Sequence, residues 1–178
     1  MSLHCMIDLE TFGVAKDSCI IQIAAVQFNH DFYVCNTFNE VISPESCQAL
    51  GMSFDMDTIM WWMNQSEEAK QKVVLQKQRS PLTEALKRFK LWLPKDTCVW
   101  SKGASFDLSI LDTAYRLAGL GRPWKHTHER CFRTMNSLVP EDHPDRPKFM
   151  GTKHDALDDC RNQINQLEFI CKKLNIII

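Results

Sequence analysis

The sequence contains no long apolar run, no excess of one charge and no closely spaced cysteine pair. Without about 18 consecutive apolar residues, it predicts no transmembrane helix. Its first residues, MSLHCMIDLE, lack the basic flank and the apolar core of a signal peptide. The formal net charge is −1, so a nucleic acid or another polyanion would have to be held by a local basic patch or by bound cations. We therefore expect no membrane partner and no binding through overall charge.

The cysteines also lack the patterns that are typical of disulfide frameworks and zinc sites. There are eight, none in a C-x-x-C arrangement, and no ligand-like spacing joins them to histidines. Cys19 lies in SCIIQIAAV and Cys98 in TCVW, both apolar surroundings. These features favour reduced cysteines that pack as small hydrophobic residues in a cytoplasmic protein.

The segments that are present predict one α/β domain. With 178 residues, 44% of them hydrophobic, and no repeat, low-complexity tract or linker, residues 1–178 are expected to form a single domain. Strand-like segments come first, as a meander, and strands then alternate with helices. This order predicts a mixed β-sheet flanked by α-helices. We expect strands at 4–10, 19–28, 32–42, 97–100 and 130–133, helices at 55–76, 81–93, 106–120 and 155–174, a hairpin turn at 29–31 and a loop at 140–153.

Two acids occupy alternate positions of the first strand, in MIDLETFG. Because side chains alternate along a strand, Asp8 and Glu10 point to the same face as Met6. Ile7 and Leu9 point to the other face. Buried carboxylates are costly unless water, hydrogen-bond donors or a cation compensates their charge. The pair is therefore either two solvated acids of an edge strand or part of a functional site.

A further acid, Asp107, stands where a strand leads into a helix. It follows a buried strand and a glycine-containing loop, in the first turn of the predicted helix. An acid there commonly complements the helix dipole and needs no other role. Such junctions are also where α/β sheets place functional groups. Position alone leaves both interpretations open.

The segment HDALDDC, residues 154–160, adds a histidine and three acids at the start of the last helix. His154 and Asp159 are five residues apart, about 140° around a helix, so they can share a site only if His154 precedes the helical turns. Asp155 and Asp159, four residues apart, form an equally good pair, and Asp155 could also be the N-cap. Helical geometry alone does not rank Asp155, Asp158 and Asp159.

Taken together, the three motifs resemble those of the DEDDh 3′–5′ exonucleases of the ribonuclease H-like superfamily. In that family an Asp-x-Glu lies on the first strand, an Asp follows a small-residue loop and a Phe, and the third motif is His-x-Ala-x-x-Asp. The matching segments are IDLETFG with Asp8 and Glu10, GASFDLSIL with Asp107, and HDALDD with His154 and Asp159.

The resemblance extends over nearly the whole chain. The stretches TIMWWMNQSEEA (58–69), WSKGASFDLSIL (100–111) and CFRT (131–134) are similar to the small exonucleases of bacteriophages and bacteria, which include enzymes for single-stranded DNA and for RNA. Lys102 departs from many relatives, which have Asn there. This departure concerns a loop contact and not the acids.

The resemblance implies a ribonuclease H-like fold and a 3′–5′ exonuclease that releases nucleoside 5′-monophosphates. It also implies two divalent ions, Mg²⁺ or Mn²⁺, which suit hard carboxylate ligands. By the family pattern, Asp8 would bridge both ions, Glu10 and Asp159 would complete one site, and Asp107 would anchor the other. His154 would be the general base that takes a proton from the attacking water.

The partner implied by this activity is the 3′ end of a single DNA or RNA strand, held without sequence readout by stacking on aromatic rings. Phe12 is one candidate ring. Trp61 and Trp62 point about 100° apart on a helix, so we expect one of them to pack in the core, and we favour Trp62 as the ring that faces the substrate. The other candidates are Thr11 toward the terminal 3′-hydroxyl, Gln65 toward phosphate or base, and Lys102 and Arg133 toward backbone phosphates.

Two further functions are compatible with the same fold. A non-catalytic nucleic-acid or partner-binding module would predict disrupted acids, and none is disrupted here. A polymerase-associated proofreading subunit would be stimulated by a polymerase. No sequence feature distinguishes the 2′-hydroxyl of RNA, so DNA and RNA both stay open as substrates. By analogy with ribonucleases of the superfamily, the chain could also form a homodimer.

Overall fold

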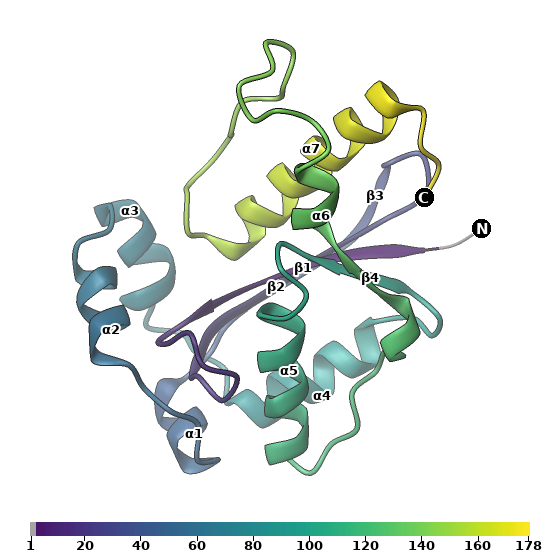
Figure 1. The fold of residues 1–178 in the computed structure, drawn as a ribbon. Coiled ribbons are helices and arrows are strands. Elements are labelled where there is room, and N and C mark those ends of the chain that lie inside the picture. The colour runs from purple at the N-terminus through teal and green to yellow at the C-terminus, as the bar shows by residue number, and fades with distance from the viewer. Residues whose placement is uncertain (1–2) are drawn as a thin grey trace.

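The structure, a computed structural model, describes residues 3–178 and is built around one mixed β-sheet (Figure 1). Its strands are β1 (His4–Thr11), β2 (Ile20–Phe28), β3 (Val34–Val41), β4 (Cys98–Ser101) and β5 (Glu129–Cys131), in the order β3-β2-β1-β4-β5. β1 pairs antiparallel with β2, and β2 with β3, whereas β4 runs parallel to both β1 and β5. The predicted meander followed by parallel strands is confirmed.

Helices lie on both faces of this sheet (Figure 1). They are α1 (Pro44–Ala49), α2 (Met56–Met63), α3 (Glu67–Ala69), the π-helical turn η1 (Lys70–Val74), α4 (Leu82–Trp92), α5 (Asp107–Leu117), the 3₁₀ turn η2 (His126–His128), α6 (Phe132–Asn136) and α7 (Ala156–Leu174). A mixed sheet flanked by helices is therefore the architecture, as the order of segments predicted.

The core explains the two faces of β1. Met6 packs with side chains of α6 and α7, whereas Ile7 and Leu9 pack with side chains of α4 and α5. β2, beside it, is buried at every position because both of its faces are covered. Since β1 is the middle strand of the sheet, Asp8 and Glu10 are not solvated acids of an edge strand. Their charges must be compensated at the strand's end.

The helix predicted over 55–76 is interrupted, and this part of the prediction is wrong. α2 ends at Met63, with Asn64 as its C-cap. Ser66 then opens α3, because its hydroxyl accepts a hydrogen bond of 3.2 Å from the backbone N–H of Ala69. Asn and Ser compete locally for backbone hydrogen bonds, which favours such a break over a continuous helix. The break turns the second half of the segment toward α7.

Two short helices follow strand ends where the sequence indicated none. α1 begins after Ser43, whose side chain accepts a hydrogen bond from the N–H of Ser46, with Pro44 in the first turn. The strand predicted at 130–133 reaches only Cys131, because α6 begins at Phe132. The loop predicted at 140–153 does lack helix and strand.

Two further expectations concern the cysteines and the membrane. All eight cysteines are unpaired, and five of them are buried. Within residues 3–178, no helix is both long enough and apolar enough to cross a bilayer.

The parallel pairing of β1 with β4 decides where the acids meet. The carboxyl ends of parallel neighbours lie at the same edge of a sheet. Glu10 at the end of β1 and Asp107 after β4 therefore share one edge. α7 begins at this edge too, because the side-chain carbonyl of Gln22 in β2 accepts a 3.0 Å hydrogen bond from the backbone N–H of Ala156.

Candidate active site

Carboxylates from three elements meet where β1 ends and α7 begins. Asp8, Glu10 and Asp159 each place an oxygen within 4.8 Å of the others, and all three residues are half-buried. Asp107, at the start of α5, is only 4% exposed, and its Oδ1 accepts a 3.2 Å hydrogen bond from the backbone N–H of Leu9. Leu9 stands between the two acids of β1, so the structure brings together all four acids that the motifs indicated.

Burial and mutual repulsion raise the pKa values of these acids. Burial first, and then the charges of Asp107, Glu10 and Asp159, hold the pKa of Asp8 well above its usual range. Burial and the charge of Asp159 do the same to the pKa of Glu10. Burial raises the pKa of Asp107 to about 6, although the hydrogen bond from the backbone N–H of Leu9 lowers it. Burial raises the pKa of Asp159 as well. Nearby protein groups thus compensate the ionised form of the cluster only in part.

The three acids of HDALDD have different partners, which ranks them. Asp155 is the N-cap of α7 and accepts hydrogen bonds from two backbone N–H groups of its first turn. Asp158 accepts a 3.0 Å hydrogen bond from the backbone N–H of Thr152 and lies 3.4 Å from the Lys72 amine. Asp159 is the one that reaches Asp8 and Glu10.

His154 lies in the turn before α7, as its spacing from Asp159 required. Its φ is 64°, in the left-handed region that residues with a side chain seldom adopt and that often marks a functional turn. The backbone N–H of His154 donates a 2.9 Å hydrogen bond to Oδ2 of Asp159, which holds the turn against the cluster. The half-buried imidazole meets the Trp61 ring edge to face, with 4.8 Å between ring centroids.

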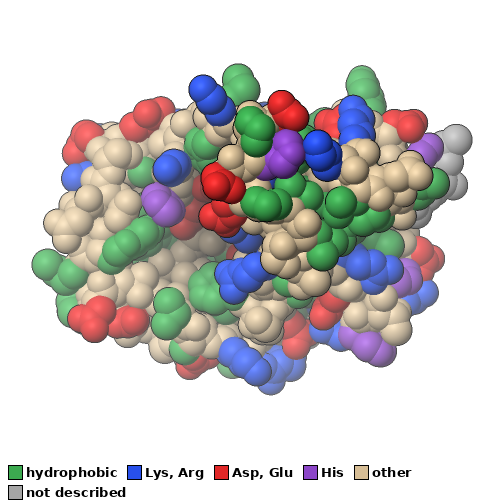
Figure 2. Space-filling model, turned by 45° about the horizontal axis from the view of Figure 1, so that its top comes forward, with side chains coloured by type: hydrophobic (Ala, Val, Ile, Leu, Met, Phe, Trp, Pro, Cys, Tyr) green, Lys and Arg blue, Asp and Glu red, His purple; other side chains and the backbone are tan. Residues whose placement is uncertain are grey.

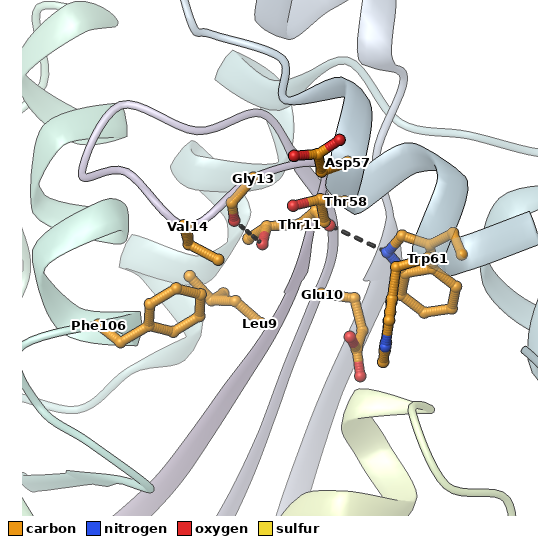
Figure 3. Close-up of a pocket in the computed structure, with 10 residues that line it drawn as sticks. Leu9, Glu10, Thr11, Gly13, Val14, Asp57, Thr58, Trp61 and Phe106 are labelled. Atoms are coloured by element: carbon orange, nitrogen blue, oxygen red, sulfur yellow. Dashed lines mark hydrogen bonds between the residues drawn. The ribbon is translucent and has the colours of Figure 1, made fainter. Parts of the chain in front are cut away.

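A cavity of about 420 Å³ opens beside Glu10, between the end of β1, α2 and the residue before α5. In Figure 3 the Trp61 ring stands next to Glu10, while Leu9 and Phe106 lie together on the opposite wall. The walls are largely apolar, and one end opens at the acidic cluster.

The two tryptophans of α2 have opposite environments, and the preference for Trp62 is corrected. Trp61 is 43% exposed, whereas Trp62 is 1% exposed. The indole N–H of Trp62 donates a 3.0 Å hydrogen bond to the backbone carbonyl of Thr11. A buried indole needs such an acceptor, and the end of β1 supplies it. Trp61 is therefore the ring that a substrate could reach.

Other predicted contacts near this cavity are less available. Phe12 belongs to the core, 6.3 Å from the ring of Phe54, so the expectation that it stacks on a base is also corrected. Thr11 lines the cavity, but its hydroxyl already donates a 2.6 Å hydrogen bond to the carbonyl of Gly13. Gln65 is half-buried, and its amide donates to the carbonyl of Trp61 at 3.1 Å. Substrate contacts of Thr11 and Gln65 stay predictions.

Two exposed basic residues stand next to the acids. The charge of Lys102, in the loop after β4, partly offsets the rise in the pKa of Asp159, and the charge of Arg133 does so for Asp107. The Arg133 guanidinium donates a 3.1 Å hydrogen bond to the carbonyl of Lys102. Figure 2 shows a hollowed face on which acidic, basic and histidine side chains lie close together. Phosphate contacts of both residues stay predictions.

The motifs did not indicate Gln163, yet it touches the acidic cluster. This side chain is 5% exposed, and its Nε2 donates a 2.7 Å hydrogen bond to Oδ1 of Asp8. Its Oε1 is buried and has no hydrogen-bond partner among residues 3–178. Gln163 follows Asp159 by four residues, so both lie on one face of α7. A polar residue at that spacing was the signal that could have found it.

Comparisons with known proteins point to 3′-5′ exonucleases. Residues 3–171 match the family described as 3′-5′ exoribonuclease Rv2179c-like domain. The chain is also 25% identical, over 201 residues, to the exodeoxyribonuclease of enterobacteria phage T4. That alignment covers 92% of this chain and 87% of the phage protein.

Solved structures are similar in fold. Exonuclease I of E. coli, in complex with a dT13 oligonucleotide, matches with a TM-score of 0.72 at 15% identity over 98% of this chain. The chain spans 42% of the length of that protein. Cell-death related nuclease 4 matches with a TM-score of 0.66 at 14% identity, over 97% of this chain and 64% of its own. These likenesses confirm the ribonuclease H-like fold. The chain belongs to the family of 3′-5′ exoribonuclease Rv2179c-like domains, and the resemblance of its motifs to those of 3′–5′ exonucleases is confirmed.

Proposed function

We propose that this exonuclease removes nucleotides from the 3′ end of single-stranded DNA or RNA, with two divalent ions and with His154 as general base. The observation that carries the proposal is the cluster of Asp8, Glu10 and Asp159 within 4.8 Å, with Asp107 beside it. The raised pKa values of these acids are what burial and mutual repulsion produce when no cation is bound between the carboxylates. An all-oxygen donor set of this kind suits Mg²⁺ or Mn²⁺.

The four acids have the task of holding the ions. Asp8, Glu10, Asp107 and Asp159 would be the protein ligands. When bound, two such ions supply positive charge to both the attacking and the leaving oxygen of a phosphodiester. They would also supply the charge that attracts a polyanion, which the net charge of −1 does not.

His154 is the residue we assign to the proton transfer. As the water oxygen bonds to phosphorus, one of its protons passes to the imidazole. The bond from phosphorus to the upstream 3′-oxygen breaks, and this oxygen takes up a proton from solvent. The products are the terminal nucleoside 5′-monophosphate and a strand one nucleotide shorter with a new 3′-hydroxyl. The backbone hydrogen bond to Asp159 and the Trp61 ring support this placement of the imidazole.

The cavity beside Glu10 is the proposed place for the terminal nucleotide. Trp61 offers an exposed ring on which any base can stack. Leu9 and Phe106 form an apolar wall opposite. Thr11 lines the same cavity and could contact the terminal sugar. No contact of this kind reads base edges, which fits an enzyme that degrades any sequence.

The test is degradation of single-stranded DNA and RNA labelled at the 3′ or the 5′ end, with Mg²⁺ or Mn²⁺. We expect mononucleotides to be released from the 3′ end, and we expect EDTA and Asp8→Ala to abolish this. His154→Ala should lower kcat by about 10²–10⁴-fold. Asp17→Ala, which removes an exposed acid between β1 and β2, is the matched control and should keep full activity. Activity that survives EDTA or Asp8→Ala would refute the metal mechanism.

The sugar of the substrate is a separate question, because the names of the relatives differ. The matched family is described by exoribonuclease activity, whereas the phage T4 protein is an exodeoxyribonuclease. Turnover on DNA and RNA oligonucleotides of one sequence and length, compared as kcat/KM, decides between them.

A further inference from the structure

A second cavity, of about 470 Å³, adjoins the acidic cluster from another side. Its walls come from the loop after β4, from α6 and α7, and from residues 140–153, which we call the strap. The two cavities share no lining residue: the first reaches the cluster at Glu10 and the second at Asp159. Carboxylate oxygens of these two residues lie within 4.8 Å of each other. A strand bound at the cluster can therefore extend into both.

The cavities differ in charge. Asp57 and Glu10 line the first, and no Lys or Arg of the described residues does. The second is lined by the basic residues Lys102, Arg146 and Lys153 and by the acids Glu141 and Asp159. Lys102 and Lys153 are exposed, and neither amine has an ion-pair or hydrogen-bond partner within residues 3–178. A terminal nucleotide has no phosphate beyond the scissile one, whereas the upstream strand adds a negative charge with every nucleotide. Charge therefore favours the second cavity for the upstream strand.

The strap is fixed in place by side chains other than those lysines. Nη1 of Arg146 donates 2.8 Å hydrogen bonds to Oδ1 of Asn136 in α6 and to Oε1 of Gln166 in α7. Asn162 in α7 pairs with the backbone of Met150 in both directions, at 2.8 and 2.7 Å. Because Arg146 is used in this way, it joins the strap to two helices and is not available to a ligand. The wall that the strap forms is therefore held in place before any ligand binds.

Two side chains that line this cavity, one from the strap and one from α7, suit a polynucleotide. Phe149 lines the cavity and is 37% exposed, so its ring has a face that a base could cover. Gln163 also lines the cavity, and its buried Oε1 lacks a donor. Cations with no partner, an exposed aromatic ring and a buried unpaired acceptor thus surround one space.

We propose that the second cavity is the subsite for the strand immediately upstream of the scissile bond. Lys102 and Lys153 contact its phosphates, and Phe149 stacks on one of its bases. The ligand is a single-stranded polynucleotide, recognised through its backbone and not through base edges. This inference rests on the proposed exonuclease function and adds to it the path of the strand across the molecule.

Two substrates that differ only upstream of the scissile bond test this path. One is a short single-stranded DNA that ends in thymidine. The other is the p-nitrophenyl ester of thymidine 5′-monophosphate, in which nitrophenolate replaces the upstream strand as the leaving group. For Lys102→Ala, Lys153→Ala and Phe149→Ala, we expect the ratio of kcat/KM on the DNA to kcat/KM on the ester to fall about tenfold. Each lysine removed should also reduce the slope of log(kcat/KM) against log[salt] on the DNA by about 0.7.

Lys148→Ala is the matched control. Lys148 lies in the same strap but lines a different groove, with Asn165 and Phe169 of α7. It should leave both the ratio and the salt slope unchanged. Equal losses on DNA and ester, or an unchanged salt slope for the lysine variants, would overturn the proposed subsite. Failure of the wild-type protein to cleave either substrate would instead refute the proposed function.

Discussion

At the scale of single residues, Gln163 shows how the chain can hold an acid ready for a metal ion. Its amide donates a 2.7 Å hydrogen bond to Asp8, the acid whose pKa burial and three neighbouring carboxylates raise. A donor to a carboxylate stabilises the charged form and fixes its orientation. Gln163 is itself fixed by burial, at 5% exposure. Its position determines where Asp8 presents its second oxygen.

Replacing Gln163 by Met, which keeps the length of the side chain and removes the donor, should weaken metal binding. We expect the affinity for Mn²⁺ to fall by about 10–100-fold. This range is typical when a neighbouring residue that donates a hydrogen bond to a metal ligand is removed. Isothermal titration of the metal-free protein with Mn²⁺ measures this directly. Gln71→Met, which removes an exposed amide that donates to Glu67, is the control. Unchanged Mn²⁺ affinity in Gln163→Met would contradict the positioning role.

At the scale of elements, the interrupted helix α2–α3–η1 fixes the turn that carries His154. From η1, the Lys72 amine donates a 2.7 Å hydrogen bond to the hydroxyl of Thr152 and lies 3.4 Å from Asp158 and 3.6 Å from Asp155. These residues flank His154 on both sides. A π-helical turn often marks a functional segment, and here it brings the lysine to this turn.

Lys72→Met should therefore loosen the turn of His154 without removing a group that contacts the substrate. We expect kcat to fall about tenfold with little change in KM, because displacing the proposed general base would cost rate and not binding. Hydrogen exchange of residues 150–156 should become faster in the same variant. Lys72→Arg should restore kcat, and Lys70→Met, which removes an ion pair with Glu67 in the preceding turn, should leave it unchanged. A parallel loss in Lys70→Met would assign the effect to helix stability instead.

The elements also explain which parts of the site were predictable. The strand alternation of MIDLETFG and the strand-to-helix position of Asp107 are local patterns, and both gave the right placement. The choice between Trp61 and Trp62, in contrast, depends on a tertiary contact. Trp62 is buried because the carbonyl of Thr11, far away in sequence, accepts its N–H. No periodicity within α2 contains that information.

The same reasoning applies to the acids of the third motif. Asp155, Asp158 and Asp159 differ by their partners from other elements: the free N–H groups of α7, Lys72 of η1, and the acids of β1. Helical spacing alone cannot distinguish them, because the distinguishing groups come from elsewhere in the chain. The family motif selected Asp159 where geometry could not.

At the scale of the whole molecule, we expect the acidic cluster to make the free energy of unfolding depend on pH and on the proposed metal ions. The folded-state pKa values of Asp8, Glu10, Asp107 and Asp159 are all raised, that of Asp107 to about 6. In an unfolded chain these groups titrate near pH 4. Between the two values the folded state binds more protons, so its free energy of unfolding falls as the pH rises. The cluster therefore costs the metal-free protein stability at neutral pH.

Neutralising one acid should remove part of this cost. In EDTA at pH 8, we expect Asp107→Asn to raise the free energy of unfolding by on the order of 1–3 kcal/mol. We expect the gain to shrink as the pH falls to 4, because Asp107 is then protonated in the folded state and partly protonated in the unfolded chain. With Mn²⁺ present the sign should reverse, because the wild-type protein gains stability from an ion that the variant holds less well. Melting curves from pH 4 to pH 8, with EDTA and with Mn²⁺, measure both effects.

Asp112→Asn, on the same helix but paired with Arg122 at 3.5 Å, should show neither the gain nor the reversal. If Asp107→Asn and the wild-type protein lose stability in parallel from pH 4 to pH 8, the cluster is not the source of the pH dependence.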